Sequence, residues 1–197
     1  VLGISRLERE YAINRFLSSQ GIRVPEIFYV NPRERLIFEE FVEGKNVIEV
    51  IKEMAADKIK AEFSLRTIRE VGSEIAEIHK LGVALGDCKP ENIVITPRGE
   101  ICFLDLEQAS KDGDKAWDIA EFLYYAGHYL PLMSPPKTAK DLTKEFIEGY
   151  LKAGGDLENV IKAGSTKYIK VFSFFTPPHI IFTISSTIRS YKEKMPG

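Results

Sequence analysis

A short β-hairpin is predicted in the middle of this chain, within sequence that otherwise has helical patterns. Apolar runs at residues 93–96 and 101–106 flank Pro97-Arg98-Gly99, which has the composition of a tight turn. A hairpin brings its two ends together. We therefore expect Asn92, directly before the first strand, and Asp105, near the end of the second, to be neighbours.

The order of the other predicted elements favours segregated helices and strands. Strands are expected at residues 26–30 and 35–41, after a first helix at 5–19. A short helix starts at Asn46, and Ser64 is expected to cap a long amphipathic helix that ends at Lys80. Further helices are expected at residues 115–129, 139–153 and 157–175, and from His179 onward. A few strands followed mostly by helices predict an α+β fold rather than alternating βαβ units.

Composition excludes several classes of protein. The 197 residues carry 27 basic and 29 acidic side chains, a net charge of −2, so no overall basic excess indicates nucleic-acid binding. No apolar run is long enough to span a membrane and no signal peptide opens the chain, so we expect a cytoplasmic protein without a membrane partner. Two cysteines, Cys88 and Cys102, cannot form a disulfide framework or a four-ligand zinc site.

The predicted hairpin gathers oxygen ligands next to a further carboxylate. Asp87 lies in the irregular segment just before Asn92, and Asp105 follows across the hairpin. Mg²⁺ prefers oxygen ligands and shares its coordination with substrate phosphates. A third carboxylate nearby is placed to accept a proton from a hydroxyl group. These are the minimum components for phosphoryl transfer.

The run Gly86-Asp87, followed after four residues by Asn92, resembles the catalytic loop of the protein-kinase-like superfamily. The resemblance implies that Asp87 is the catalytic base and that Lys89 contacts the γ-phosphate of ATP. It also implies that Asn92 and Asp105 hold Mg²⁺ (or Mn²⁺), with Asp105 in place of the aspartate of Asp-Phe-Gly, although the triplet here is Asp-Leu-Glu.

The resemblance extends to both lobes of a kinase. It implies that Glu10 pairs with a lysine of the small lobe and that backbone groups of Glu40, Phe41 and Val42 bind adenine at the hinge. Asp118 corresponds to the aspartate that braces the catalytic loop. We therefore expect two lobes, a truncated sheet lobe over residues 1–44 and a mostly helical catalytic lobe over residues 45–197.

Several departures from the pattern of protein kinases narrow the class of kinase that this sequence resembles. Only nine residues precede Glu10, so the glycine-rich loop and strand lysine are absent from this sequence, and we expect the amino-terminal part of the small lobe to be missing from it. A kinase remnant with little activity is the alternative. Asp105 and Asp118 are 13 residues apart, and Gly86 replaces the usual arginine, so we expect no switching by phosphorylation of an activation loop. This places the chain beside atypical kinases, such as the RIO kinases and the small archaeal kinase of the KEOPS assembly, or beside aminoglycoside and choline phosphotransferases.

Three hypotheses for function follow. The first is an atypical serine/threonine protein kinase that uses ATP. The second is a small-molecule kinase, which the short segment after Asp105 and the glutamate Glu107 favour. The third is a non-catalytic pseudokinase. The acceptor is accordingly a hydroxyl group of a protein or of a small molecule. Isolated loop residues such as Asp87 and Asn92 often have only structural roles, and Glu10 lies in a charged run typical of a solvated helix face.

Overall fold

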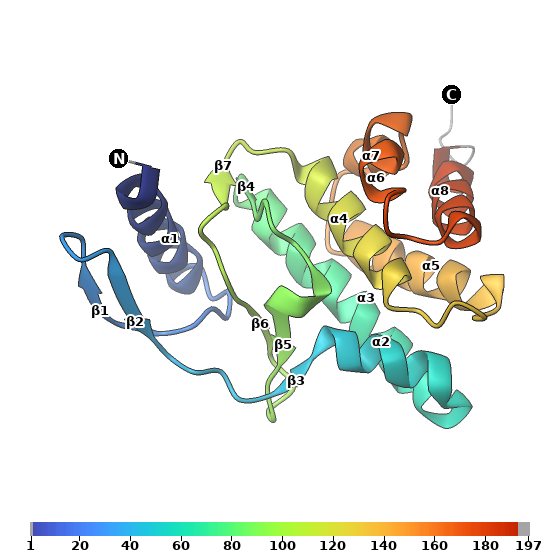
Figure 1. The fold of residues 1–197 in the computed structure, drawn as a ribbon, viewed down its shortest axis with the longest axis horizontal. Coiled ribbons are helices and arrows are strands. Elements are labelled where there is room, and N and C mark those ends of the chain that lie inside the picture. The colour runs from blue at the N-terminus through green and yellow to red at the C-terminus, as the bar shows by residue number, and fades with distance from the viewer. Residues whose placement is uncertain (1, 193–197) are drawn as a thin grey trace.

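The computed structural model describes residues 2–192, apart from the side chains of residues 2–5 and 58. Residue 1 and residues 193–197, which the two expected lobes include, lie outside this range. Helices dominate, and small antiparallel sheets lie among them, in agreement with the expected α+β class (Figure 1). No helix within the described part of the chain combines the length and the apolar character needed to cross a bilayer.

One helix and a two-stranded sheet lie together at the amino-terminal end of the molecule (Figure 1). Helix α1 (Leu2–Ser19) precedes the antiparallel strands β1 (Ile27–Asn31) and β2 (Leu36–Glu39). The Asn31 side chain stabilises the turn between the strands, because its oxygen accepts hydrogen bonds from the N–H groups of Arg33 and Glu34. Arg35 adopts a left-handed φ of 58° at the end of this turn. The second strand therefore starts after Arg35 and is shorter than predicted.

The rest of the described chain is mostly helical. Its helices are α2 (Val47–Ala56), α3 (Lys58–Lys80), α4 (Lys115–His128), α5 (Pro136–Lys152), α6 (Leu157–Ala163), α7 (Thr166–Phe172) and α8 (Pro178–Lys192). Asn46 caps α2 as predicted, its side chain accepting a hydrogen bond from the Ile48 N–H. Buried side chains of all these helices join one hydrophobic core.

The backbones of α3 and α5 meet where a glycine of each helix faces the other. A Cβ added at Gly149 would overlap the Arg69 carbonyl group, and one added at Gly72 would overlap the carbonyl group of Phe146. Beside the crossing, the Arg69 guanidinium contacts Glu145 at 2.7 Å and Glu148 at 2.6 Å. Because glycine has no side chain, the two helix backbones approach closely at this crossing, and the ion pairs of Arg69 fix the alignment of the helices.

The central hairpin is present, with the predicted consequence for its ends. Strand β5 (Ile93–Ile95) pairs with β6 (Ile101–Phe103) and with the short β3 (Lys45–Asn46), and the single-turn helix η1 (Pro90–Asn92) leads into it. The Leu104 N–H donates to the Asn92 carbonyl at 2.8 Å, which joins the two ends. A second small sheet pairs β4 (Val83–Ala84) with β7 (Ser110–Lys111).

Several predicted helix boundaries are wrong. Helix α3 begins at Lys58, where the Asp57 side chain caps it, so Ser64 is buried inside the helix and is no cap. The single helix predicted over residues 157–175 is two helices, because Gly164 and Ser165 separate α6 from α7. Helix α1 also starts earlier than predicted.

Candidate active site

Asp87, Asn92 and Asp105 line one narrow crevice at the ends of the central hairpin, together with apolar side chains from both strands. The Asn92 amide nitrogen lies 3.1 Å from a carboxylate oxygen of Asp87 and 3.1 Å from its carbonyl oxygen. Asp105 follows β6 in a left-handed conformation with a φ of 53°, and its side chain is exposed. The crevice therefore brings together the three residues that the spacing predicted to be neighbours.

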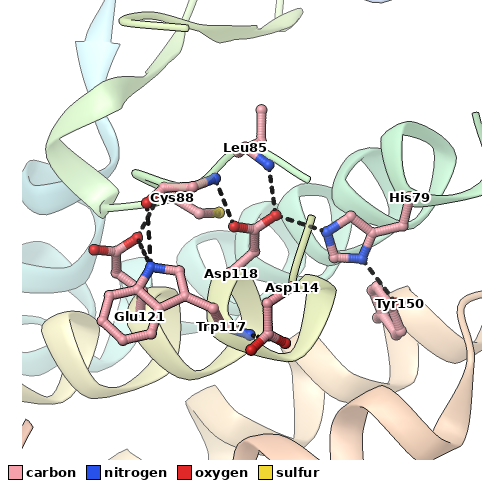
Figure 2. Close-up of polar contacts among 9 residues, drawn as sticks. His79, Leu85, Cys88, Asp114, Trp117, Asp118, Glu121 and Tyr150 are labelled. Atoms are coloured by element: carbon pink, nitrogen blue, oxygen red, sulfur yellow. Dashed lines mark hydrogen bonds and ion pairs between the residues drawn. The ribbon is translucent and has the colours of Figure 1, made fainter. Parts of the chain in front are cut away.

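The loop that carries Asp87 is held from below by Asp118 of α4 (Figure 2). The fully buried Asp118 carboxylate accepts hydrogen bonds from the Leu85 N–H at 2.6 Å and from the Gly86 N–H at 2.8 Å. Gly86 has a φ of 75°, and a Cβ there would lie 2.6 Å from the Gln108 carbonyl oxygen. The residue before Asp87 is thus a glycine for conformational and steric reasons.

A second carboxyl group of α4 holds the other side of the loop. Glu121 Oε2 accepts hydrogen bonds from the Cys88 N–H at 2.7 Å and from the indole N–H of Trp117 at 3.1 Å. The same indole N–H lies 3.1 Å from the Gly86 carbonyl oxygen. Burial, followed by the nearby charge of Asp87, raises the pKa of Glu121 to about 8. The sequence analysis did not identify Glu121, since nothing in the local pattern separates it from an ordinary helical glutamate.

His79 of α3 connects Asp118, which holds the loop, to α5. Its Nε2 lies 3.0 Å from Asp118 Oδ2, and its Nδ1 lies 2.8 Å from the hydroxyl group of Tyr150 in α5. The imidazole is 3% exposed, so both ring nitrogens are satisfied inside the core. His79, at the end of α3, therefore links Tyr150 of α5 to Asp118 of α4, so the position of Asp118 depends on how α3 and α5 pack.

Lys89 lies beside Asp87, two residues after it in the loop. Its ammonium is 2.5 Å from Asp87 Oδ1 and 5.5 Å from the centre of the Tyr125 ring. Burial opposes the charged form, yet the contact with Asp87 raises the pKa of Lys89 above its ordinary value. The lysine is therefore a cation, and the Tyr125 ring, which also packs on Phe175 at 4.7 Å, forms a wall beside it.

Glu10 of α1 is half-buried and lies among carboxylates that include Asp105 of the crevice. Burial and the neighbouring carboxylates Glu39, Asp105 and Glu107 together raise the pKa of Glu10 to about 7. Burial, with Asp105 adding to it, also raises the pKa of Glu39. Among the side chains that the structure describes, none forms an ion pair with Glu10. The predicted pairing residue thus lies where carboxylates gather and a cation would stabilise them.

The predicted adenine-binding segment follows β2 and borders a polar cavity of about 500 Å³. The Glu40 N–H donates to the Glu26 carbonyl at 2.8 Å, and the Glu40 carboxylate pairs with Arg23. These contacts occupy the amide and the side chain of Glu40, so neither is available to a base. Phe41 is 88% exposed and Val42 is half-buried.

The oxygen donors beside the crevice are of the kind that a divalent cation shared with a substrate prefers. The Asn92 amide nitrogen faces Asp87, which leaves the Asn92 side-chain oxygen for another partner, and the Asp105 carboxylate is exposed beside it. Within residues 2–192 no group of three or more His, Cys, Asp or Glu side chains is arranged to hold a metal ion. The donor set therefore suits Mg²⁺ completed by phosphate oxygens and water rather than an all-protein site.

Cys88 is unsuited to nucleophilic catalysis although it adjoins Asp87. The thiol is fully buried, and burial raises its pKa well above the ordinary value. A buried, protonated thiol is unreactive.

Comparison with known proteins places these residues in a family context. The model of the lipopolysaccharide kinase (Kdo/WaaP) family matches residues 1–150. The KEOPS complex subunit Bud32 of Pyrococcus abyssi is 31% identical over 107 residues, which cover 54% of this chain and 46% of that protein.

Two further relatives extend this similarity. A probable serine/threonine-protein kinase BUD32 homolog of Archaeoglobus fulgidus is 28% identical over 115 residues, covering 58% of this chain and 56% of that protein. A probable bifunctional tRNA threonylcarbamoyladenosine biosynthesis protein of Thermoplasma volcanium is 25% identical over 160 residues, covering 80% of this chain and 28% of its own length. The chain thus spans about half or less of the length of these relatives.

Proposed function

The chain belongs to the lipopolysaccharide kinase (Kdo/WaaP) family, and from this premise we propose that it acts as an atypical serine/threonine protein kinase that uses ATP. The observation that carries the proposal is the convergence of Asp87, Asn92 and Asp105 on one crevice, with the Lys89 ammonium in contact with Asp87. The names of the Bud32 relatives support a protein acceptor and assembly with KEOPS-type partners.

We assign residues 1–44 to a small lobe and residues 45–197 to a catalytic lobe, with the nucleotide between them. In this assignment the backbone of residues 40–42, apart from the engaged N–H of Glu40, contacts adenine. Glu10 faces the cation of the phosphate site from the small lobe. Asn92 and Asp105 would hold Mg²⁺ or Mn²⁺, and the metal ion would neutralise charge on the phosphates.

The protein's own groups supply positioning and proton transfer. The Asp87 carboxylate orients the acceptor hydroxyl group and takes its proton as the hydroxyl oxygen bonds to the γ-phosphorus and the bond from that phosphorus to the departing ADP breaks. Lys89 moves from Asp87 toward the transferring phosphoryl group, whose negative charge attracts the ammonium. Tyr125 limits the directions in which the lysine can move.

A phosphoryl-transfer assay tests the proposal. The chain is incubated with γ-labelled ATP and Mg²⁺ or Mn²⁺, with a generic protein acceptor, and autophosphorylation is recorded in parallel. Asp87→Asn and Asp105→Asn should abolish transfer and leave the circular dichroism spectrum unchanged. Asp112→Asn is the matched control, because Asp112 is an exposed turn residue outside the crevice. Undiminished transfer by the Asp105 variant would refute the assignment.

A small-molecule acceptor is the second candidate. The family match covers more of the chain than the Bud32 alignment with Pyrococcus abyssi, and the family name denotes kinases of lipopolysaccharide. Sugars and amino alcohols are therefore added to the assay as acceptors. Label on these compounds and none on protein would select this alternative. Binding of ATP without transfer to any acceptor would instead indicate a pseudokinase.

A further inference from the structure

Glu121 is a buried carboxyl group that takes no direct part in the proposed phosphoryl transfer. Its side chain is 3% exposed and projects from α4 one turn after Asp118. Figure 2 shows both carboxyl groups directed from this helix toward the catalytic loop. Buried acidic side chains are rarely retained without partners, and the partners of Glu121 are two uncharged donors, the Cys88 N–H and the Trp117 indole.

We propose that Glu121 is a positioning residue that fixes the backbone on the carboxyl-terminal side of Asp87. The inference rests on the proposed role of Asp87 as the catalytic base. Asp118 holds the N–H groups of the two residues before Asp87, and Glu121 holds the N–H group of the residue after it. Asp87 is therefore bracketed by two acceptors that are carried by a single helix.

Trp117 connects the two sides of this bracket. Its indole N–H is shared between Glu121 Oε2 and the Gly86 carbonyl oxygen, each at 3.1 Å. Trp117 is in turn packed on Phe172 of α7, with ring centres 5.3 Å apart. Loss of the Glu121 acceptor would leave the buried Cys88 N–H without a partner and would release one contact of the indole. A buried donor without a partner is unfavourable, so the loop would shift to recover one.

The electrostatics of the site indicate that an acceptor oxygen, rather than a negative charge, performs this task. Burial and the charge of Asp87 raise the pKa of Glu121, so a full second negative charge beside Asp87 is disfavoured. A glutamine presents a carbonyl oxygen on a side chain of the same length. Glu121→Gln should therefore preserve the loop, whereas Glu121→Ala should not.

Kinetics of the whole chain provide the first test. Glu121→Ala should lower kcat roughly 10- to 100-fold, the usual effect of misplacing a catalytic group by about 1 Å, with the KM for ATP nearly unchanged. Glu121→Gln should recover most of kcat. Phe122→Leu is the matched control: Phe122 is the next residue of α4 but stacks on Phe146 away from the loop, so it should reduce thermal stability without changing kcat.

Thiol labelling provides a second test that does not depend on activity. Cys88 and Cys102 are both buried, and only Cys88 adjoins Glu121 through its N–H. The proteins are treated with a maleimide, and the labelled cysteines are identified by peptide mapping. Cys88 should be labelled about tenfold faster in the Glu121→Ala variant than in the unaltered protein, whereas the labelling rate of Cys102 should be unchanged and serves as the internal reference.

The outcomes are distinguishable. Equal labelling of Cys88 in the alanine variant and in the unaltered protein, or an alanine variant as active as the glutamine variant, would overturn the positioning role. An unaltered protein without any phosphoryl transfer would refute the proposed kinase function. Labelling would still decide whether Glu121 holds the loop, because it needs no substrate.

Discussion

The substitution Gly149→Ala tests the close crossing of α3 and α5. The added methyl group would overlap the carbonyl group of Arg69 and would lie only 2.8 Å from its carbonyl carbon. Both partners are helix backbone, so relief requires the two helices to separate by about 1 Å, which we infer from an ordinary carbon contact of about 3.5–4.0 Å. Overpacking of this kind costs about 3 kcal/mol, at the upper end of the usual range.

Helix propensity offsets part of this loss. Alanine is favoured over glycine in a helix by about 1 kcal/mol, so the net loss of unfolding free energy is about 2 kcal/mol. For a chain of this size that corresponds to a decrease in Tm of about 4–8 °C, measured by circular dichroism or calorimetry. Because the crossing sets the position of Tyr150 against His79, phosphoryl transfer should fall in the same variant.

Gly127→Ala is the matched control for this experiment. A Cβ at Gly127 of α4 would lie 2.8 Å from Cγ2 of Ile180 and 2.8 Å from Cδ1 of Ile184, which are side-chain atoms rather than helix backbone and can be displaced by a small adjustment of α8. The steric loss should therefore be about 1 kcal/mol and should cancel the gain in propensity, leaving Tm within about 2 °C of the unaltered protein. A Gly149→Ala protein as stable as the Gly127→Ala protein would refute the backbone-contact argument.

Three further predictions concern the crevice and its loop. Burial and neighbouring carboxylates, including Asp105, raise the pKa of Glu10 from 4.5 to about 7. The protonated Glu10 side chain is therefore favoured in the folded state, and the stability that it contributes is lost as the pH rises through this interval. The Glu10→Gln variant should have the same Tm as the unaltered protein near pH 4.5 and a higher Tm above pH 7. Added Mg²⁺ and ATP should reduce that difference, and a difference that persists unchanged would count against a cation near Glu10. Gly86→Ala should lower both Tm and activity, because φ is 75° and the methyl group would lie 2.6 Å from the Gln108 carbonyl oxygen; a fully active variant would contradict this. Asp118→Asn should reduce kcat roughly 100-fold with helix content unchanged, since one of the two acceptor oxygens becomes an NH₂ group that would face a backbone N–H, and near-normal kinetics would show that Asp118 is dispensable.

The arrangement of the crevice was predictable because it follows from chain geometry. A two-stranded hairpin must bring its ends together, and this is sufficient to place Asn92 beside Asp105 once the turn is recognised. The α+β class followed from the order of the predicted elements. The assignments of Asp87, Lys89 and the hinge residues to catalysis and nucleotide binding stay predictions until transfer is measured.

The failures of the sequence analysis have a common physical origin. Apolar spacing continues across Gly164 and Ser165, so periodicity could not reveal that α6 and α7 are separate helices. Burial of a polar side chain is also a tertiary property. The acceptor role of Glu121 depends on Cys88, which is 33 residues away in the sequence, and the contact of His79 with Tyr150 spans 71 residues. Neither contact leaves a local signature in the sequence.

The attachment of the loop that carries Asp87 to a single core helix has a consequence for the mobility of that loop. Residues 85–88 are irregular in conformation, and such segments ordinarily exchange their amide hydrogens quickly. Here three of the four amides donate to carboxyl groups that belong to α4. Exchange at these positions should therefore require α4 itself to detach, so the loop should be protected nearly as long as the helices beneath it.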